Sequence, residues 1–281
     1  MNLITEAEKK ELLVDMMERL DNYLKQNRIE YYLAYGTLLG AVRHQGFIPW
    51  DDDIDIVVPR KDFYKLIHLL EKNPPELEKV NLSILEYGRQ KKSYHQRFKI
   101  ADTRTVMEEF GKERNAVFID VFPLDCLKSK KTKFAKKLIL FLDNISVLCY
   151  SGETVRVGIK GVVSKMIIGF NKLLGQDRMT AFYEKCVLYL SKYKEGGYLG
   201  YLEDVKSPRS LNSVEYYKKK AYLQFETLVL PCASEYERVL TEMYGDYMKL
   251  PSENERHNHS EYVMYWREGH SILDIRNVNK Q

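Results

Sequence analysis

The sequence predicts an α+β protein, with a mixed sheet core flanked by helices and a mainly helical C-terminal extension. Strand-like runs rich in β-branched and aromatic residues alternate with helical patterns as far as about residue 127. Beyond that point helical spacing dominates, at residues 131–149, 160–174, 177–193, 215–221 and 233–244. We therefore expect one domain over residues 1–127 and a helical region over residues 128–281 that completes the substrate site.

The first elements follow from local patterns. Thr5 and Glu8 form a capping-box pattern, and apolar residues then recur with helical spacing to about Asn27. IEYYLAYG predicts a strand ending at Gly36, and TLLGAVRHQG predicts a helix closed by Gly46. IDIVVP predicts a buried strand. RKDFYKLIHLLEK predicts a helix with the apolar face Phe63, Leu66, Ile67 and Leu70.

Three later runs, VNLSILEY, SYHQRFKIA and AVFIDVFPLD, also predict strands. The last should end at Pro123, because proline has no N–H to donate to the ladder. KGVVSKMIIGFNKLLG predicts a helix with the core face Val163, Ile167, Phe170 and Leu174. The four cysteines are far apart in apolar surroundings, so we expect reduced, buried thiols at Cys126, Cys149, Cys186 and Cys232.

Composition limits the classes of partner. With 281 residues, 44% of them hydrophobic, the chain can bury a core, and a net charge of +4 excludes a histone-like basic protein. We expect no nucleic-acid partner. The start MNLITEAEKKELL has no signal-peptide pattern, and no apolar run reaches the roughly 18 residues of a spanning helix. These features predict a cytoplasmic protein.

Four aspartates, Asp51, Asp52, Asp53 and Asp55, fall within five residues that lead into IDIVVP. On a strand, Asp53 and Asp55 project from the same face, with Cα atoms about 6.6 Å apart. Two carboxylates this close repel each other, so a rigid pair favours a hard divalent cation, Mg²⁺ or alternatively Mn²⁺. A solvated acidic turn is the other reading of this cluster.

Two further features favour a site over a solvated turn. Gly36 and Thr37 lie at a strand-to-helix turn, where backbone N–H groups and the hydroxyl can hold a phosphate. FIDVF offers a third carboxylate, Asp120, on a separate strand. A calcium loop of the EF-hand type does not fit, because Ile56 and Asp62 stand where that loop needs glycine and glutamate.

The order strand, G[ST] turn, helix, [DE]h[DE]h strand and h[DE]h strand resembles the nucleotidyltransferase superfamily. YGTLLGAVRHQGFIPWDDDIDIVVP resembles, more specifically, the LicD family of bacterial phosphocholine transferases, which is related to fukutin and the fukutin-related protein. RFKIADTRT, VFIDVFPLD and YGDYMKLPSENERHNHS resemble further segments of that family. The resemblance spans roughly residues 25 to 260.

This resemblance implies an enzyme, a phosphotransferase with its catalytic core in residues 1–127. Its donor would be a CDP-linked alcohol, most commonly CDP-choline, which releases CMP. The acceptor would be a hydroxyl of a cell-surface glycan or teichoic-acid precursor, lipid-linked in some cases. Asp53, Asp55 and Asp120 would be the catalytic residues and the ligands of Mg²⁺. Asp120 would also accept the proton of the acceptor.

The remaining site residues follow from the same resemblance and from charge. Gly36 and Thr37 would bind the phosphates, and Lys99 with Arg97 would add positive charge, although Lys99 could equally be a solvated strand lysine. Choline has no hydrogen to donate and needs aromatic faces, for which Trp50 is the best-placed residue.

Several readings stay open. Arg43 and His44 fit a helix C-terminus better than a catalytic role, and His257 and His259 fit a surface loop better than a metal site. The lysines at 128–137 and 160–174 could rest on an anionic membrane. Two alternative functions are a nucleotidyltransferase that releases pyrophosphate and a non-catalytic nucleotide- or glycan-binding protein. The oligomeric state is not indicated.

Overall fold

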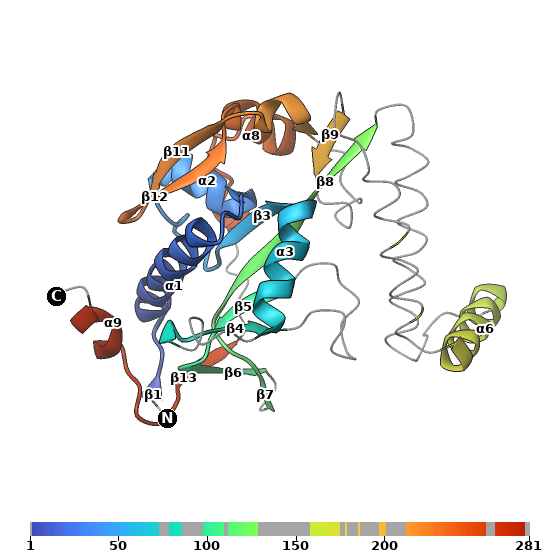
Figure 1. Cartoon of the computed structure of the whole chain (residues 1–281), viewed down its shortest axis with the longest axis horizontal. Coiled ribbons are helices and arrows are strands. Elements are labelled where there is room, and N and C mark those ends of the chain that lie inside the picture. The colour runs from blue at the N-terminus through green and yellow to red at the C-terminus, as the bar shows by residue number, and fades with distance from the viewer. Residues whose placement is uncertain are drawn as a thin grey trace. The chain divides into compact units, whose positions relative to one another are not determined.

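The computed structural model describes residues 2–72, 79–85, 98–109, 112–128, 158–174, 197–200, 212–256 and 262–278, together with residues 178 and 185. Figure 1 shows the helices and strands in chain order. The chain divides into two compact units. Unit 1 comprises residues 1–85, 98–122 and 216–281, and unit 2 comprises residues 86–97 and 123–215. The α+β class is confirmed. The domain boundary near residue 127 stays a prediction.

The main sheet of unit 1 carries the acidic residues. Its strands lie in the order β2, β3, β8, β5, β4. Their bounds are β2 Tyr32–Leu33, β3 Asp55–Pro59, β8 Phe118–Lys128, β5 Phe98–Asp102 and β4 Leu82–Leu85. Ile54, Ile56 and Val58 are fully buried, so alternate residues of this segment face the core as predicted. Asp53 and Asp55 are thereby directed to the other face.

Three helices pack in the same unit. Helix α1 (Glu6–Gln26) begins with the predicted capping box of Thr5 and Glu8. Helix α3 (Arg60–Glu71) buries the predicted apolar face of Phe63, Leu66, Ile67 and Leu70. Helix α2 (Tyr35–His44) lies between β2 and the acidic segment in the chain. These helices bury the apolar stripe that their spacing predicts.

The ends of α2 differ from the prediction. The helix begins at Tyr35, so Gly36 lies inside its first turn instead of before it. It is closed by Gln45, which adopts the left-handed conformation with φ 56°, and not by Gly46. Gly46 serves a different purpose, because a Cβ there would lie 2.2 Å from Oε1 of Glu226. The glycine permits close approach of the turn between β11 (Lys220–Phe225) and β12 (Leu228–Ala233), which sequence spacing does not reveal.

A second sheet of unit 1 has the strand order β1, β13, β6, β7. The bounds are β1 Asn2–Leu3, β13 Val263–Trp266, β6 Thr105–Glu109 and β7 Lys112–Asn115. Further C-terminal elements are η3 Val214–Tyr217, the hairpin β11 Lys220–Phe225 and β12 Leu228–Ala233, α8 Tyr236–Tyr244, η4 Glu253–Glu255 and α9 Leu273–Val278. The helix at 233–244 is confirmed as α8. The α-helix predicted at 215–221 is wrong: its first residues belong to the short 3-10 helix η3, and Lys220 and Ala221 pair with β12 as the start of β11.

Unit 2 contains the C-terminal part of β8, β9 (Gly197–Gly200), β10 (Asn212–Ser213) and α6 (Gly158–Leu174). Strand β8 does not end at Pro123. Phe118 to Val121 pair with β5, and Asp125 to Lys128 pair with β9. Pro123 lies between these two ladders, so neither ladder loses a hydrogen bond through the N–H that proline lacks. The helices predicted at 131–149 and 177–193 lie outside the described residues, apart from residues 178 and 185.

Helix α6 confirms the prediction at 160–174 but not its buried face. Ser164 and Ile168 are buried, at 1% and 7% exposure, whereas Val163 is 48% exposed. The helix has apolar residues of its own on every side, so their spacing alone does not predict which side is buried. Among the predicted buried thiols, Cys232 is free and buried. The side chains of the other three cysteines lie outside the described part.

Candidate metal-binding site

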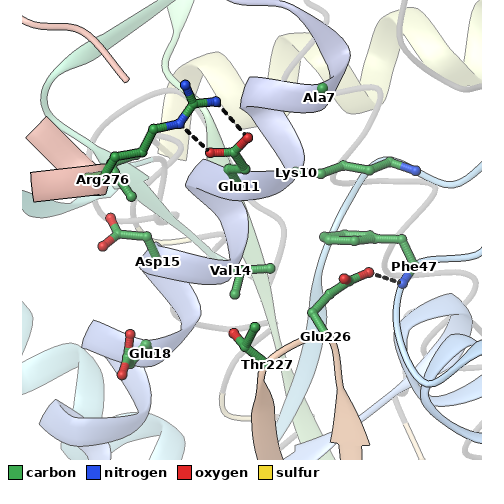
Figure 2. Close-up of a pocket in the computed structure, with 11 residues that line it drawn as sticks. Ala7, Lys10, Glu11, Val14, Asp15, Glu18, Phe47, Glu226, Thr227 and Arg276 are labelled. Atoms are coloured by element: carbon green, nitrogen blue, oxygen red, sulfur yellow. Dashed lines mark hydrogen bonds and ion pairs between the residues drawn. The ribbon is translucent and has the colours of Figure 1, made fainter. Parts of the chain in front are cut away.

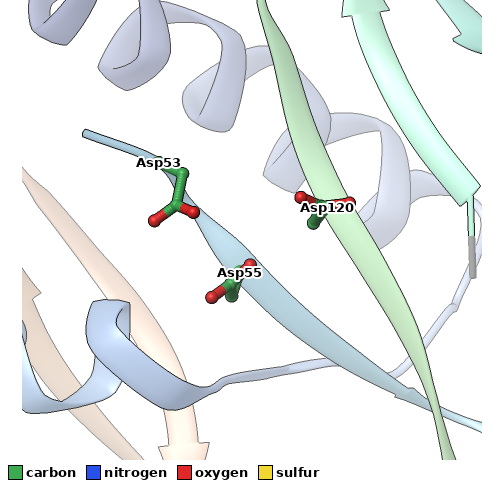
Figure 3. A group of neighbouring side chains, drawn as sticks. All are labelled: Asp53, Asp55 and Asp120. Atoms are coloured by element: carbon green, nitrogen blue, oxygen red, sulfur yellow. The ribbon is translucent and has the colours of Figure 1, made fainter. Parts of the chain in front are cut away.

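Three carboxylates converge where β3 and β8 lie side by side. Asp53, Asp55 and Asp120 each offer an oxygen within 4.8 Å of the others (Figure 3). The backbone N–H of Asp120 donates a 3.0 Å hydrogen bond to the carbonyl oxygen of Ile54, the residue between the other two aspartates. This pairing of neighbouring strands brings together residues more than sixty positions apart in the sequence. The predicted three-carboxylate cluster is therefore present.

The electrostatics of the cluster favour a bound cation. Burial raises the pKa of Asp53 to about 7, with further contributions from the negative charges of Asp51, Asp120 and Asp52 and a hydrogen bond with Asp51. Asp120 is 8% exposed, and its Oδ1 has no hydrogen-bond partner among the described residues. A buried carboxylate oxygen without a donor is costly. Oxygens of this kind fit a hard divalent ion.

Asp52 belongs to a different environment. Its carboxylate forms an ion pair with the ammonium of Lys9 on α1, and the two residues are 4% and 6% exposed. Alternation along the chain turns Asp52 to the same side as Ile54, away from Asp53. One of the four clustered aspartates is thus paired with a helix, and the acidic segment is anchored to α1.

Gly36 and Thr37 contact the acidic segment directly. The Thr37 hydroxyl accepts a 2.8 Å hydrogen bond from the backbone N–H of Asp55, and Thr37 is only 2% exposed. A Cβ on Gly36 would lie 2.3 Å from Oδ2 of Asp51. Both residues therefore shape the loop and strand that carry the carboxylates. Their binding of a phosphate stays a prediction.

Lys99 lies beside the cluster. It is directly opposite Asp120 in the β5–β8 pair, and its Nζ is 3.5 Å from Asp120 Oδ2. The same Nζ lies 3.1 Å from the centroid of the Phe118 ring. The side chain is 19% exposed, so it is not an ordinary solvated strand lysine. Arg97, its predicted companion, lies outside the described residues.

Trp50 has cationic neighbours of its own. The Cζ atoms of Arg43 and Arg256 lie 5.9 and 5.0 Å from its ring centroid, and the ring of His44 meets it edge to face at 6.5 Å. Arg43 was expected only to cap a helix, and Arg256, although it lies in the family-like segment YGDYMKLPSENERHNHS, was not predicted as a site residue. His257 and His259 lie outside the described residues.

The segment RFKIADTRT contributes a buried ion network next to its strand. Asp102 is fully buried and accepts hydrogen bonds from Arg104 at 2.7 and 3.0 Å and from Arg19 at 2.8 Å. Burial alone would raise the pKa of Asp102, but these guanidinium groups lower it below its ordinary value. Arg104 also contacts Asp15 of α1 at 3.0 Å. The network ties β5 to α1.

A cavity of about 310 Å³ lies elsewhere in unit 1 (Figure 2). Residues of α1, Phe47, the β11–β12 turn and α9 line it, and none of the three clustered carboxylates does. Two of the lining residues form an ion pair, in which Arg276 donates hydrogen bonds of 2.8 and 3.0 Å to the two carboxylate oxygens of Glu11. The cavity is therefore distinct from the carboxylate site.

The sheet, the helix α2 and the three carboxylates define a nucleotidyltransferase-type domain. Residues 28–145 match the family described as LicD/FKTN/FKRP, nucleotidyltransferase domain. The matched range includes α2 and the three carboxylates, and the resemblance to the LicD family is confirmed.

Three individual proteins are similar to this chain. A protein of Haemophilus influenzae named lipopolysaccharide cholinephosphotransferase LicD is 26% identical over 274 residues, which cover 92% of this chain and 97% of that protein. An uncharacterised protein of Rickettsia prowazekii is 40% identical over 72 residues, 26% of each chain. One of Rickettsia typhi is 51% identical over 57 residues, 20% of this chain and 18% of that protein. The expectation of an enzyme of the transferase class is confirmed.

Proposed function

We propose that this protein transfers phosphocholine from CDP-choline to a hydroxyl of a cell-surface glycan, with CMP as the leaving group. The observation that carries the proposal is the convergence of Asp53, Asp55 and Asp120 within a LicD-family domain. The Haemophilus influenzae relative, which matches nearly end to end, is named for cholinephosphotransfer to lipopolysaccharide. A lipopolysaccharide or teichoic-acid precursor is therefore the acceptor class to test first.

The three carboxylates would hold Mg²⁺, with Mn²⁺ as the alternative. When bound, such an ion neutralises charge on the donor diphosphate. The fit rests on the close approach of the three carboxylates and on the unpartnered oxygen of Asp120. The raised pKa of Asp53 supports it, because repulsion between neighbouring carboxylates is relieved by a cation.

The residues of the chain have separate parts in the proposed reaction. The acceptor hydroxyl oxygen forms a bond to the choline-bearing phosphorus as the bond from that phosphorus to the CMP oxygen breaks. The hydroxyl proton passes to the carboxylate of Asp120, whose Oδ1 has no donor among the described residues. Lys99, beside Asp120, would bind phosphate oxygens, and Gly36 and Thr37 would hold the segment that carries Asp55 in place.

The products distinguish this function from its rivals. The purified chain would be incubated with Mg²⁺, an isolated glycan acceptor and, separately, CDP-choline, CDP-ribitol or ATP. We expect CMP from CDP-choline and phosphocholine on the acceptor. Release of pyrophosphate from ATP would instead identify a nucleotidyltransferase, and CMP from CDP-ribitol alone would change the alcohol. No product from any donor would favour a non-catalytic binding protein.

We further propose that the enzyme works in the cytoplasm with peripheral contact to an anionic membrane. Helix α6 exposes Val162, Val163 and Met166, at 59%, 48% and 70%, and its sequence has three lysines and no acidic residue. Among the described helices, none has the length and apolar run needed to cross a bilayer. Co-sedimentation with anionic vesicles should fall in a V163D/M166D variant. No sedimentation of the unaltered chain at low salt would remove this proposal.

A further inference from the structure

Two arginines that are distant in sequence gather around one indole in unit 1. Arg43 lies in the last turn of α2, and Arg256 follows η4 more than two hundred residues later. Their Cζ atoms lie 5.9 and 5.0 Å from the ring centroid of Trp50, within the range of a cation–π contact. All three side chains are partly buried. The tertiary fold therefore concentrates two positive charges at one aromatic residue.

Neutral groups hold both guanidinium groups in place. Arg43 donates a 3.0 Å hydrogen bond to the carbonyl oxygen of Tyr247, and Nε of Arg256 donates one of 3.1 Å to the carbonyl oxygen of Pro251. Nε of Arg43 also lies 3.5 Å from Nδ1 of His44. In the described ranges neither arginine forms an ion pair with a carboxylate.

Arg238 shows how an arginine at an aromatic ring can be paired with a carboxylate. Arg238 also lies over an aromatic ring, at 5.8 Å from the centroid of Tyr216, but it is paired with Glu235 at 3.4 Å. Arg43 and Arg256 both lie at the ring of Trp50, and neither has such a carboxylate within the part of the chain that the structure describes. Two guanidinium groups at one indole, without a carboxylate counter-charge among the described residues, make the surroundings of Trp50 positive, and a bound anion would neutralise that charge.

The chain places this pair near the carboxylate cluster. Trp50 precedes Asp53 by three residues, so their Cα atoms are at most about 11 Å apart. The intervening segment is not fully extended, because the N–H of Asp51 donates to the carbonyl oxygen of Ile48 at 2.9 Å. The backbone that carries Trp50 is therefore near the backbone that carries Asp53.

We propose that Arg43 and Arg256, supported by Trp50, form a binding site for a phosphoryl anion. The planar guanidinium group matches the geometry of phosphate oxygens, and two such groups suit a diphosphate or a phosphodiester. Trp50 then serves as a platform for the protein's own cations and not as a face for choline. Assignment of the anion to the donor or to the acceptor rests on the proposed function. Binding of an anion by the two arginines does not depend on it.

The test measures binding without turnover. Pyrophosphate is titrated into the full chain by calorimetry, at low salt, with EDTA present so that no metal contributes. Tryptophan fluorescence gives a second readout, because the chain has two tryptophans and Trp266 is only 1% exposed. We expect saturable binding that R43Q and R256Q each weaken roughly tenfold to a hundredfold, as loss of a charged hydrogen bond predicts. R238Q, the matched control, should bind as the unaltered chain does.

The outcomes are separable from those of the transferase assay. Absence of pyrophosphate binding, or equal affinity in R43Q and R256Q while circular dichroism shows them folded, would overturn the proposal. R43K and R256K should keep part of the affinity. The titrations are then repeated with CDP, which represents the donor, and with glycerol phosphate, which represents the acceptor. The ligand whose binding R43Q and R256Q weaken identifies the source of the anion. Intact pyrophosphate binding without phosphocholine transfer would count against the proposed function alone.

Discussion

The hydroxyl of Thr37 accepts a 2.8 Å hydrogen bond from the backbone N–H of Asp55. Thr37 belongs to the first turn of α2, and Asp55 is the first residue of β3. Thr37 is 2% exposed, so water cannot easily replace its hydroxyl in this bond. The contact fixes the start of the strand that carries a carboxylate of the candidate metal site, and it connects fold stability with the geometry of that site.

Replacement of Thr37 by valine should lower stability and weaken metal binding together. T37V keeps the size of the side chain but leaves the Asp55 N–H without its acceptor, which costs about 1 to 3 kcal/mol. Urea unfolding measures the stability, and calorimetric titration with Mg²⁺ measures the site. T37S retains the hydroxyl and should stay close to the unaltered chain. Equal stability of T37V and T37S would contradict a role for this bond.

Neutralisation of the clustered carboxylates should remove metal binding without unfolding the chain. D53N, D55N and D120N each remove a charged oxygen from the cluster while relieving repulsion among its members. We expect no saturable Mg²⁺ binding by calorimetry and no CMP release. The free energy of unfolding without metal should be unchanged or higher. Retained turnover in both D53N and D55N would refute the assignment of the cluster as the catalytic centre.

The neighbouring aspartate should behave in the opposite way. D52N leaves the buried ammonium of Lys9 without its counter-charge, and breaking a buried ion pair from one side costs about 3 to 5 kcal/mol. Chemical unfolding should therefore show a large loss of stability in D52N, in contrast to D53N. A K9M/D52N double variant removes both charges and should recover part of the loss. A neutral effect of D52N would show that the pair does not anchor the acidic segment.

The stability of the metal-free chain should fall as pH rises toward neutrality. Burial and neighbouring carboxylates raise the pKa of Asp53 from 3.8 to about 7, so the folded chain binds this proton more tightly than the unfolded chain does. The stabilisation is complete below the unfolded pKa and is lost as pH rises through the folded pKa. Thermal unfolding in EDTA between about pH 5 and pH 8 measures the slope. D53N should flatten the slope of stability against pH, and Mg²⁺ should restore stability near pH 8. If D53N leaves the slope unaltered, other titratable groups cause it.

A methyl group at Gly36 should disturb the acidic segment. The Cβ of G36A would lie 2.3 Å from Oδ2 of Asp51, so that side chain must move. We expect weaker Mg²⁺ binding and lower turnover, measured by the assays described above. The matched control is G169A on α6, where no atom lies within 4 Å of the added Cβ and alanine favours the helix by up to about 1 kcal/mol. Equal metal affinity in G36A and the unaltered chain would show that Asp51 moves without consequence.

Local patterns were sufficient for several elements and for part of the site. The capping box of Thr5 and Glu8, the apolar face of α3 and the alternation through Ile54 and Ile56 are determined by residues within one or two turns of each other. Asp53 and Asp55 share a face for the same reason. Asp120 was placed at the site through an ordered set of motifs, and the structure confirms its proximity.

Other features depended on distant residues. The helix predicted at 215–221 is reduced to the 3-10 turn η3, because from Lys220 onward the chain pairs with β12, and these cross-strand partners outweigh local helical spacing. The buried side of α6 was mispredicted because the helix has apolar residues on every side. Which side is buried depends on the residues that pack against it. Pro123 could remain inside β8 because the strand changes partners there.

The sequence by itself determined the α+β class, the strand that begins at Asp55 and the motifs typical of the LicD family, since each depends on neighbouring residues in fixed order. Only the tertiary structure decided that Lys9 neutralises Asp52, that Thr37 holds the backbone of Asp55, and that Arg43 and Arg256 meet at Trp50. These contacts join segments whose approach is fixed by sheet order and helix packing, and no local periodicity specifies which side chains will meet there.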